Sequence, residues 1–199
     1  MGKLRTTINN YDANEVISAL QKSIRRGLEK DAMFWAMELL PKYRRWLWQR
    51  LMVIVNEDIG IASPFAIVLI DTQKRNWEEF YAEKRYGTCN MILANAILYM
   101  CRSKKTRIAD HFHTVVTQER TQLGLSLEIP DWALDKHTYR GKSMGRSFEH
   151  WRAEGCKLDP PNSVPDPYED RAHELWPTKK DPEWYGALPT DDETDEDRV

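Results

Sequence analysis

Residues 18–60 read SALQKSIRRGLEKDAMFWAMELLPKYRRWLWQRLMVIVNEDIG, and this stretch decides the fold. Its apolar residues recur at intervals of three and four, which is the period of an α-helix with one buried face. We therefore predict three closely linked helices. The expected inward residues are, in turn, Ile17, Leu20, Ile24 and Leu28; then Met33, Met37 and Leu40; then Leu47, Leu51, Ile54 and Val55. Pro41 is expected to end the second helix and Gly60 the third.

The same period continues outward from this stretch. Asp12 or Asn14 can cap the first helix, and Ser63 followed by Pro64 predicts a fourth helix start. We expect the inward residues of the following helices to be Phe65, Val68 and Leu69, then Cys89, Ile92, Leu93, Ala96, Ile97 and Met100, then Ile108, Phe112, Val115 and Val116. No segment alternates convincingly like a strand, so the predicted class is all-α.

The residues of this region resemble the helical collar that follows the ATPase core in the replication-associated recombination protein A and Werner-helicase-interacting ATPase family, which is related to the clamp loaders. The matching residues are Ser18, Ala19, Lys22, Ser23, Ile24, Arg25, Asp31, Ala32, Phe34, Trp35, Arg50, Leu51, Glu57, Asp58, Ile59 and Gly60, with Ala94, Ile97, Tyr99 and Lys104 in a less specific second half. The resemblance implies a clamp-loader-collar-like helical bundle with an irregular C-terminal extension. It also implies oligomerisation, commonly as a tetramer.

Four segments are expected: an N-terminal arm over 1–14, a collar-like domain over 15–128, a basic and aromatic extension over 129–156, and a Pro-rich acidic tail over 157–199. The tail has too few periodic apolar residues to pack, and we expect it to be disordered. Because only 17 residues precede Ser18, we expect no ATPase module, no cofactor and no enzymatic activity.

Charge is distributed unevenly along the chain. Residues 157–199 carry a net charge of −8, whereas residues 1–156 carry +6. A basic body is compatible with nucleic acid or with an acidic protein surface. Three widely spaced cysteines and the absence of an apolar signal or membrane-length run predict a cytoplasmic protein with no membrane partner.

Glu57 and Asp58 are predicted to lie at a helix C-terminus, where the helix dipole disfavours negative charge. We expect nearby arginines to compensate, and we predict a structural latch made of Glu57, Asp58, Arg25 and Arg50, with Arg26 as another candidate partner. Arg25, Arg26, Arg44 and Arg45 are also expected at or near an assembly interface.

The extension mixes cations with aromatic residues, a combination typical of nucleic-acid contact. The predicted nucleic-acid-binding residues are Lys136, Arg140, Lys142, Arg146, Arg152 and Trp151. The alternative is that Trp132, Leu134 and Phe148 pack the extension while its cations face solvent. Gly141-Lys142-Ser143 resembles the end of a phosphate-binding loop, but Lys136 stands where that loop needs glycine, so no ATP site is predicted.

Residues 122–127, QLGLSL, resemble the short peptide with which many bacterial replication proteins dock into the sliding clamp. Gln122, Leu123, Leu125 and Leu127 would be its contact residues if this segment is an extended loop. The alternative is that the leucines belong to the core.

The function expected from these observations is a non-enzymatic oligomerisation or adaptor protein of DNA replication, repair or recombination. It would act as a homo-oligomer, with a tetramer as one candidate, or join a separately encoded AAA+ ATPase. The alternative is a DNA-binding module that acts through residues 136–152. A third reading is an enzyme that uses the histidines, whose spacing is poor for a metal site.

Overall fold

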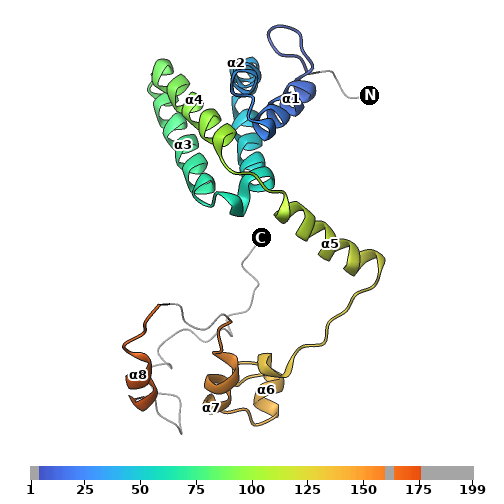
Figure 1. Ribbon diagram of the computed structural model, residues 1–199, viewed down its shortest axis with the longest axis vertical. Coiled ribbons are helices and arrows are strands. Elements are labelled where there is room, and N and C mark those ends of the chain that lie inside the picture. Colours follow the sequence, from blue (N-terminus) through green and yellow to red (C-terminus); the bar gives the residue numbers. More distant parts are fainter. Residues whose placement is uncertain (1–4, 160–163, 176–199) are drawn as a thin grey trace, which may run out of the picture. The chain divides into compact units, whose positions relative to one another are not determined.

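The computed structural model describes residues 5–159 and 164–175, and it divides the chain into two compact units, 1–125 and 126–199 (Figure 1). Regular structure in the described residues is helical, apart from one isolated bridge between Thr6 and Asp12. The predicted all-α class is therefore confirmed.

The first helix, α1 (Ala13–Arg26), begins where its sequence predicts but ends before Leu28. Of the two candidate caps, Asp12 is the one used, because its carboxylate accepts hydrogen bonds from the Asn14 and Glu15 amides at 2.7 and 3.4 Å. Gly27 ends the helix in a left-handed conformation with φ of 72°. Leu28 was expected to face inward but is 45% exposed, because it lies beyond this end.

The second helix, α2 (Glu29–Ile54), runs through Pro41, so the predicted helix end at this proline is wrong. The chain bends instead at Tyr43, whose φ of −129° and ψ of 31° are not helical. The predicted inward stripe is also shifted: Met37 is 39% exposed, whereas Ala32, Ala36 and Leu39 are fully buried. Small alanines at these positions allow close packing against α1.

The chain then tightens into a π-helical turn, η1 (Val55–Ile59), and a 3₁₀ turn, η2 (Gly60–Ala62). Gly60 joins them with φ of 45° and ψ of −130°, a conformation that other residues rarely adopt. The next helix, α3 (Phe65–Ala82), has no side-chain cap, so the predicted Ser63 hydroxyl cap is wrong. The Ser63 carbonyl accepts from the Ala66 amide instead, at 2.9 Å.

The inward face of α3 is not the predicted one. Phe65 and Val68 are 80% and 64% exposed, while Ala66, Ile70 and Trp77 are buried. The reversal follows from helix register, because Ala66, Ile70 and Trp77 share one face and Phe65 with Val68 share another. Two large apolar residues are thereby left on the surface.

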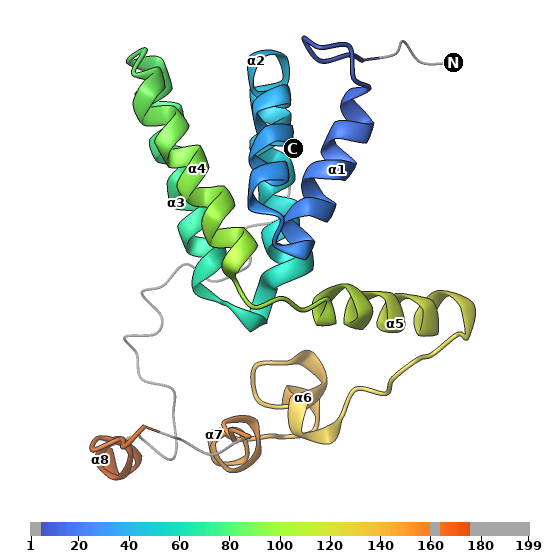
Figure 2. The same ribbon diagram turned by 45° about the horizontal axis from the view of Figure 1, so that its top comes forward.

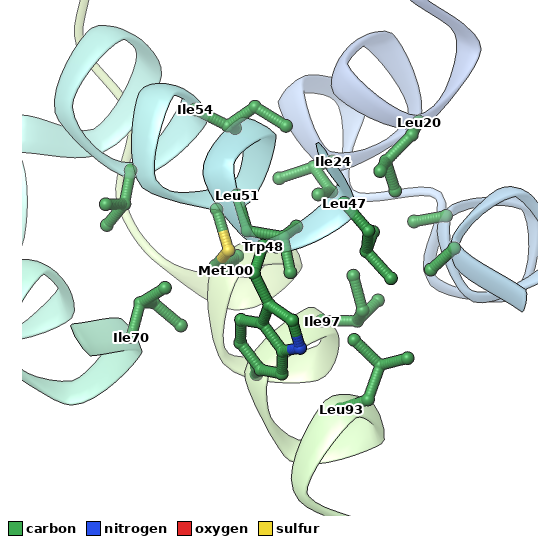
Figure 3. Close-up of a cluster of buried hydrophobic side chains, with 14 of the residues drawn as sticks. Leu20, Ile24, Leu47, Trp48, Leu51, Ile54, Ile70, Leu93, Ile97 and Met100 are labelled. Atoms are coloured by element: carbon green, nitrogen blue, oxygen red, sulfur yellow. The ribbon is translucent and has the colours of Figure 1, made fainter. Parts of the chain in front are cut away.

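The helix α4 (Tyr86–Arg102) has the predicted buried face. It packs along α3, and α2 packs against α1, α3 and α4 (Figures 1 and 2). The side chains that meet at the centre include Leu20, Ile24, Leu47, Trp48, Leu51, Ile54, Ile70, Leu93, Ile97 and Met100 (Figure 3). Burial beside this core raises the pKa of the Cys101 thiol to about 11.

The helix α5 (Ile108–Gln122) has no fully buried residue, so the expectation that Ile108, Phe112, Val115 and Val116 face a core is wrong. It extends away from the four-helix bundle, and its first turn lies beside η1 (Figure 2). None of the helices in the described ranges is long and apolar enough to cross a bilayer.

The second unit contains short helical elements: η3 (Asp131–Ala133), α6 (Tyr139–Ser143), α7 (Phe148–His150), η4 (Trp151–Gly155) and α8 (Glu169–Leu175). Leu134 is its buried apolar residue among those described. The unit boundary at Leu125 lies close to the predicted boundary at residue 128. Of the predicted tail, residues 164–175 include α8, whereas residues 160–163 and 176–199 lie outside the described part.

The register of α3 leads to a first prediction. Ile70→Ala should lower the free energy of unfolding by about 2–5 kcal/mol because it leaves a cavity in the core. Phe65→Ala, the matched exposed change, should alter it by no more than about 0.5 kcal/mol. Denaturant unfolding at low protein concentration measures both values. A larger loss for Phe65→Ala than for Ile70→Ala would contradict the register.

Candidate functional site

A cluster of charged side chains joins η1 to α1. The Asp58 side chain is fully buried, and its Oδ1 lies 2.8 Å from Arg25 Nε. Arg25 Nη2 also donates to Asp58 Oδ2 at 3.1 Å and to Glu57 Oε1 at 3.4 Å. The structure thus brings together three of the four residues of the predicted latch.

Arg107 is a member of this cluster that the sequence analysis missed. Its Nη2 lies 3.2 Å from Glu57 Oε1 and 2.6 Å from Asp110 Oδ2, and its Nε lies 3.8 Å from Asp58 Oδ1. The Thr106 amide donates to the Asp58 carbonyl at 3.0 Å. The available signal was an arginine at a helix start with an aspartate three residues later.

Gln21 links the remaining predicted residue to the cluster. Its Nε2 donates to Glu57 Oε2 and Asp58 Oδ2, each at 3.1 Å, while its Oε1 accepts from Arg50 Nη1 at 3.4 Å. Arg50 therefore reaches the carboxylates through an amide and not through an ion pair. Arg26 donates to the Lys22 carbonyl at 3.1 Å and forms no ion pair with Glu57 or Asp58.

This cluster fixes the start of α5, which then presents an apolar face outward. Ile108, Phe112 and Val115 are 51%, 69% and 53% exposed, and Val116 continues the face at 38%. The spacing of four, three and one places all four on one side of the helix. Monomeric proteins seldom expose such contiguous apolar groups, which typically mark interaction sites.

A second apolar stripe follows η1 in the chain. Ile61, Phe65 and Val68 are 69%, 80% and 64% exposed and are spaced by four and three residues. Near the start of α5, a cleft of about 450 Å³ is lined by Met52, Val53, Asn56, Glu57, Asp110 and His113. The first unit therefore carries two exposed apolar stripes, both adjoining segments that the charged cluster holds.

In the second unit, several predicted nucleic-acid contacts are engaged internally. Arg146 pairs with Asp131, and Lys136 Nζ lies 4.6 Å from the centre of the Phe148 ring. Trp151 packs against Phe148 with ring centres 4.8 Å apart.

The remaining predicted cations of the extension differ in exposure. Arg152 is half-buried, whereas Arg140 and Lys142 are exposed. Gly141, Lys142 and Ser143, which resemble the end of a phosphate-binding loop in sequence, lie in the short helix α6 and not in an open loop.

The histidines of this unit make local contacts. His137 Nδ1 lies 3.1 Å from Asp135 Oδ2, and this hydrogen bond holds the pKa of Asp135 below its usual value. His150 Nε2 lies 4.0 Å from Asp131 Oδ2. No group of three or more metal-ligating side chains occurs within residues 5–159 and 164–175.

The clamp-like segment begins at Gln122, the last residue of α5, and continues beyond the helix. Leu123 and Leu127 are 78% and 82% exposed, and Leu125 is 46% exposed. Residues 124–130 have no regular secondary structure. The alternative that these leucines belong to the core is therefore wrong.

A helical bundle with a charged cluster and outward apolar helix faces defines the class as an all-α helical domain. Comparison with family models gives its family. The model described as the MgsA AAA+ ATPase C terminal matches residues 29–170. The chain therefore belongs to this family of AAA+ ATPase C-terminal domains, and the resemblance stated from the sequence is confirmed. No curated protein matches the chain.

The buried carboxylate of the cluster leads to a second prediction. Asp58→Ala should lower the free energy of unfolding by about 3–5 kcal/mol, because it leaves the Arg25 and Arg107 charges without their buried partner. Thermal and denaturant melts measure this loss.

Glu29→Gln is the matched control. It removes a carboxylate whose 2.7 Å pair with Arg102 is exposed to solvent, so stability should hardly change. Identical melts for Asp58→Ala and Glu29→Gln would contradict a structural role of the Asp58 cluster.

Proposed function

We propose that this chain is a non-enzymatic assembly domain that binds other copies of itself or the helical collar of AAA+ ATPase subunits. The observation that carries the proposal is the apolar face of α5, formed by Ile108, Phe112, Val115 and Val116, which the rest of the first unit leaves exposed. A helix that packs its apolar face against nothing is only marginally stable in water. Burial against a second protein would supply the missing apolar contact.

The charged cluster supports the same proposal. Arg107 and Asp110 lie at the start of α5 and connect it to Glu57 in η1. The helix is thereby held at one end while its apolar face stays free along its length. A preorganised face of this kind loses less conformational entropy on association than a disordered segment does.

The arginines expected at an interface offer less support than the apolar stripes. Arg25 is committed to the charged cluster, and the Arg44 guanidinium lies 4.8 Å from the centre of the Tyr81 ring. We therefore place the principal contact on α5, with Ile61, Phe65 and Val68 as a second contact that would allow more than two copies to associate. A tetramer is one assembly that two different contacts can form.

Family membership supports a role beside the AAA+ ATPases of DNA replication, repair or recombination. In this role the chain supplies contacts and not chemistry.

A third prediction tests the assembly proposal. The full chain should show a mass above that of a monomer in light scattering, or should bind an added AAA+ ATPase subunit of this family. Phe112→Asp should abolish either association by placing a charge on the apolar face, while circular dichroism stays unchanged. Tyr139→Asp is the matched control, because Tyr139 is also exposed, at 86%, but lies in the second unit. A wild-type monomer at every concentration that binds no ATPase subunit would refute the proposal.

The exposure of Leu123 and Leu127 favours a second candidate function, docking to a sliding clamp. An extended peptide can place a glutamine amide and two apolar side chains into preformed pockets. Gln122, Leu123, Leu125 and Leu127 would make these contacts.

A fourth prediction tests this docking. In surface plasmon resonance, Leu123→Ala with Leu127→Ala should weaken binding to an immobilised bacterial sliding clamp at least about tenfold, since two buried leucines are lost. Leu158→Ala with Val164→Ala removes two other exposed apolar side chains and should have no effect. Equal binding by both variants and the wild type would exclude docking through this peptide.

A further inference from the structure

A concave cationic surface lies where α2 bends. Around Tyr43 a cleft of about 530 Å³ is lined by Arg5, Lys42, Tyr43, Arg44, Arg45, Trp46 and Gln49. Four of these seven residues are cations, two are aromatic, and none is a carboxylate. We call this surface, with its extension toward Lys74, the kink cleft.

The bend in α2 and the N-terminal arm together form the kink cleft. The Tyr43 hydroxyl donates to the Thr6 carbonyl at 3.1 Å, and Lys42 Nζ donates to the Thr6 and Thr7 carbonyls at 3.3 and 3.1 Å. These bonds hold the arm against α2 and bring the Arg5 guanidinium to 5.9 Å from the centre of the Trp46 ring. Cations distant in the sequence are thereby gathered at one place.

The kink cleft continues into a second recess of about 310 Å³. This recess shares Arg44, Arg45 and Gln49 with the first and adds Trp48, Lys74, Trp77 and Glu78. Five cations therefore line a continuous surface that includes a single carboxylate.

The cations of the kink cleft differ from those of the charged cluster in their partners. Arg25 and Arg107 pair with carboxylates, whereas Arg5, Lys42, Arg44, Arg45 and Lys74 form no ion pair within the described part of the chain. Holding several like charges together without counter-charges is unfavourable. An anionic ligand would relieve this repulsion and release the ions that screen it.

We propose that the kink cleft binds the phosphodiester backbone of a single-stranded nucleic acid. Guanidinium groups bind phosphate oxygens in a bidentate way, and Arg44 and Arg45 border both recesses. Tyr43 and Trp46 lie among the cations, and unpaired bases can stack on aromatic rings of this kind. Bases stacked within a duplex cannot reach these aromatic rings. An acidic peptide would supply negative charge but no bases to stack on the rings.

This site is distinct from the predicted one in residues 136–152. In that segment Arg146 pairs with Asp131 and Lys136 lies over Phe148, so part of its charge is already engaged. The kink cleft also lies apart from the apolar residues of α5 that carry the assembly proposal. Nucleic-acid binding does not depend on that proposal.

The test is fluorescence anisotropy of a labelled oligothymidylate of about 20 nucleotides with the full chain, over a series of salt concentrations. The double variant Arg45→Ala with Lys74→Ala is suited to it, because neither side chain has a hydrogen bond or ion pair with the described residues. Each lost phosphate contact lowers the salt slope of single-strand binding by about 0.7, so the slope should fall by about 1.4. Affinity at low salt should fall at least about tenfold.

Lys30→Ala with Lys104→Ala is the matched control, since it removes the same charge from exposed positions of the first unit that do not line the kink cleft. Its slope and affinity should equal those of the wild type. Should the Arg45 and Lys74 variant fail to fold by circular dichroism, Arg44→Lys with Arg45→Gln serves in its place and should lower affinity in the same direction.

Two competitors identify the ligand class. A matched duplex and a polyglutamate of equal charge should each displace the oligothymidylate at least about tenfold less effectively than unlabelled oligothymidylate does. Displacement by polyglutamate at equal strength would overturn the proposal in favour of an acidic protein partner. An unchanged slope in the cleft variant, or an equal loss in the control variant, would overturn it as well.

Discussion

The buried carboxylate of Asp58 is the constraint on which the first unit depends. It lies in a π-helical turn between α2 and α3, and burial of a charge is unfavourable unless partners surround it. Arg25 supplies one partner from α1, and Arg107 supplies another from the start of α5. One side chain thus ties together segments that lie about 30 and 50 residues away in the chain.

The helices of the first unit therefore differ in what their apolar faces contact. Helices α1 to α4 bury their apolar faces against one another, whereas α5 is held by polar contacts at its beginning and keeps its apolar face exposed. A helix fixed in this way is suited to pack against another protein without loss of the bundle. The bend at Tyr43 gathers cations on a different surface, which includes none of the exposed apolar residues of α5.

Much of this fold could be predicted from the sequence because helical periodicity is a local property. The face of α4, from Cys89 to Met100, has one broad apolar side and was predicted correctly. In α3 the apolar residues occur on more than one side, so the period alone could not decide between Phe65 and Ile70. In α5 the predicted apolar face is present but has no partner within the unit, and the period of the sequence cannot show whether a face is buried.

Only part of the candidate site could be predicted from the sequence, for a similar reason. Glu57, Asp58 and Arg25 could be connected because a charged pair at a helix end requires compensation. Arg107 could not, because its approach depends on the path of the chain after α4. The kink cleft was hidden because Pro41 was expected to end a helix, whereas the chain bends and continues.

We infer that another protein covers the apolar face of α5. Amide hydrogen exchange tests this inference directly. It is measured in three conditions: with the chain dilute, with the chain concentrated, and with the chain mixed with an AAA+ ATPase subunit of this family. We expect α5 to exchange quickly when the chain is dilute and to become protected in at least one of the other two conditions, while α4 stays protected throughout. Equally fast exchange of α5 in all three conditions would contradict it.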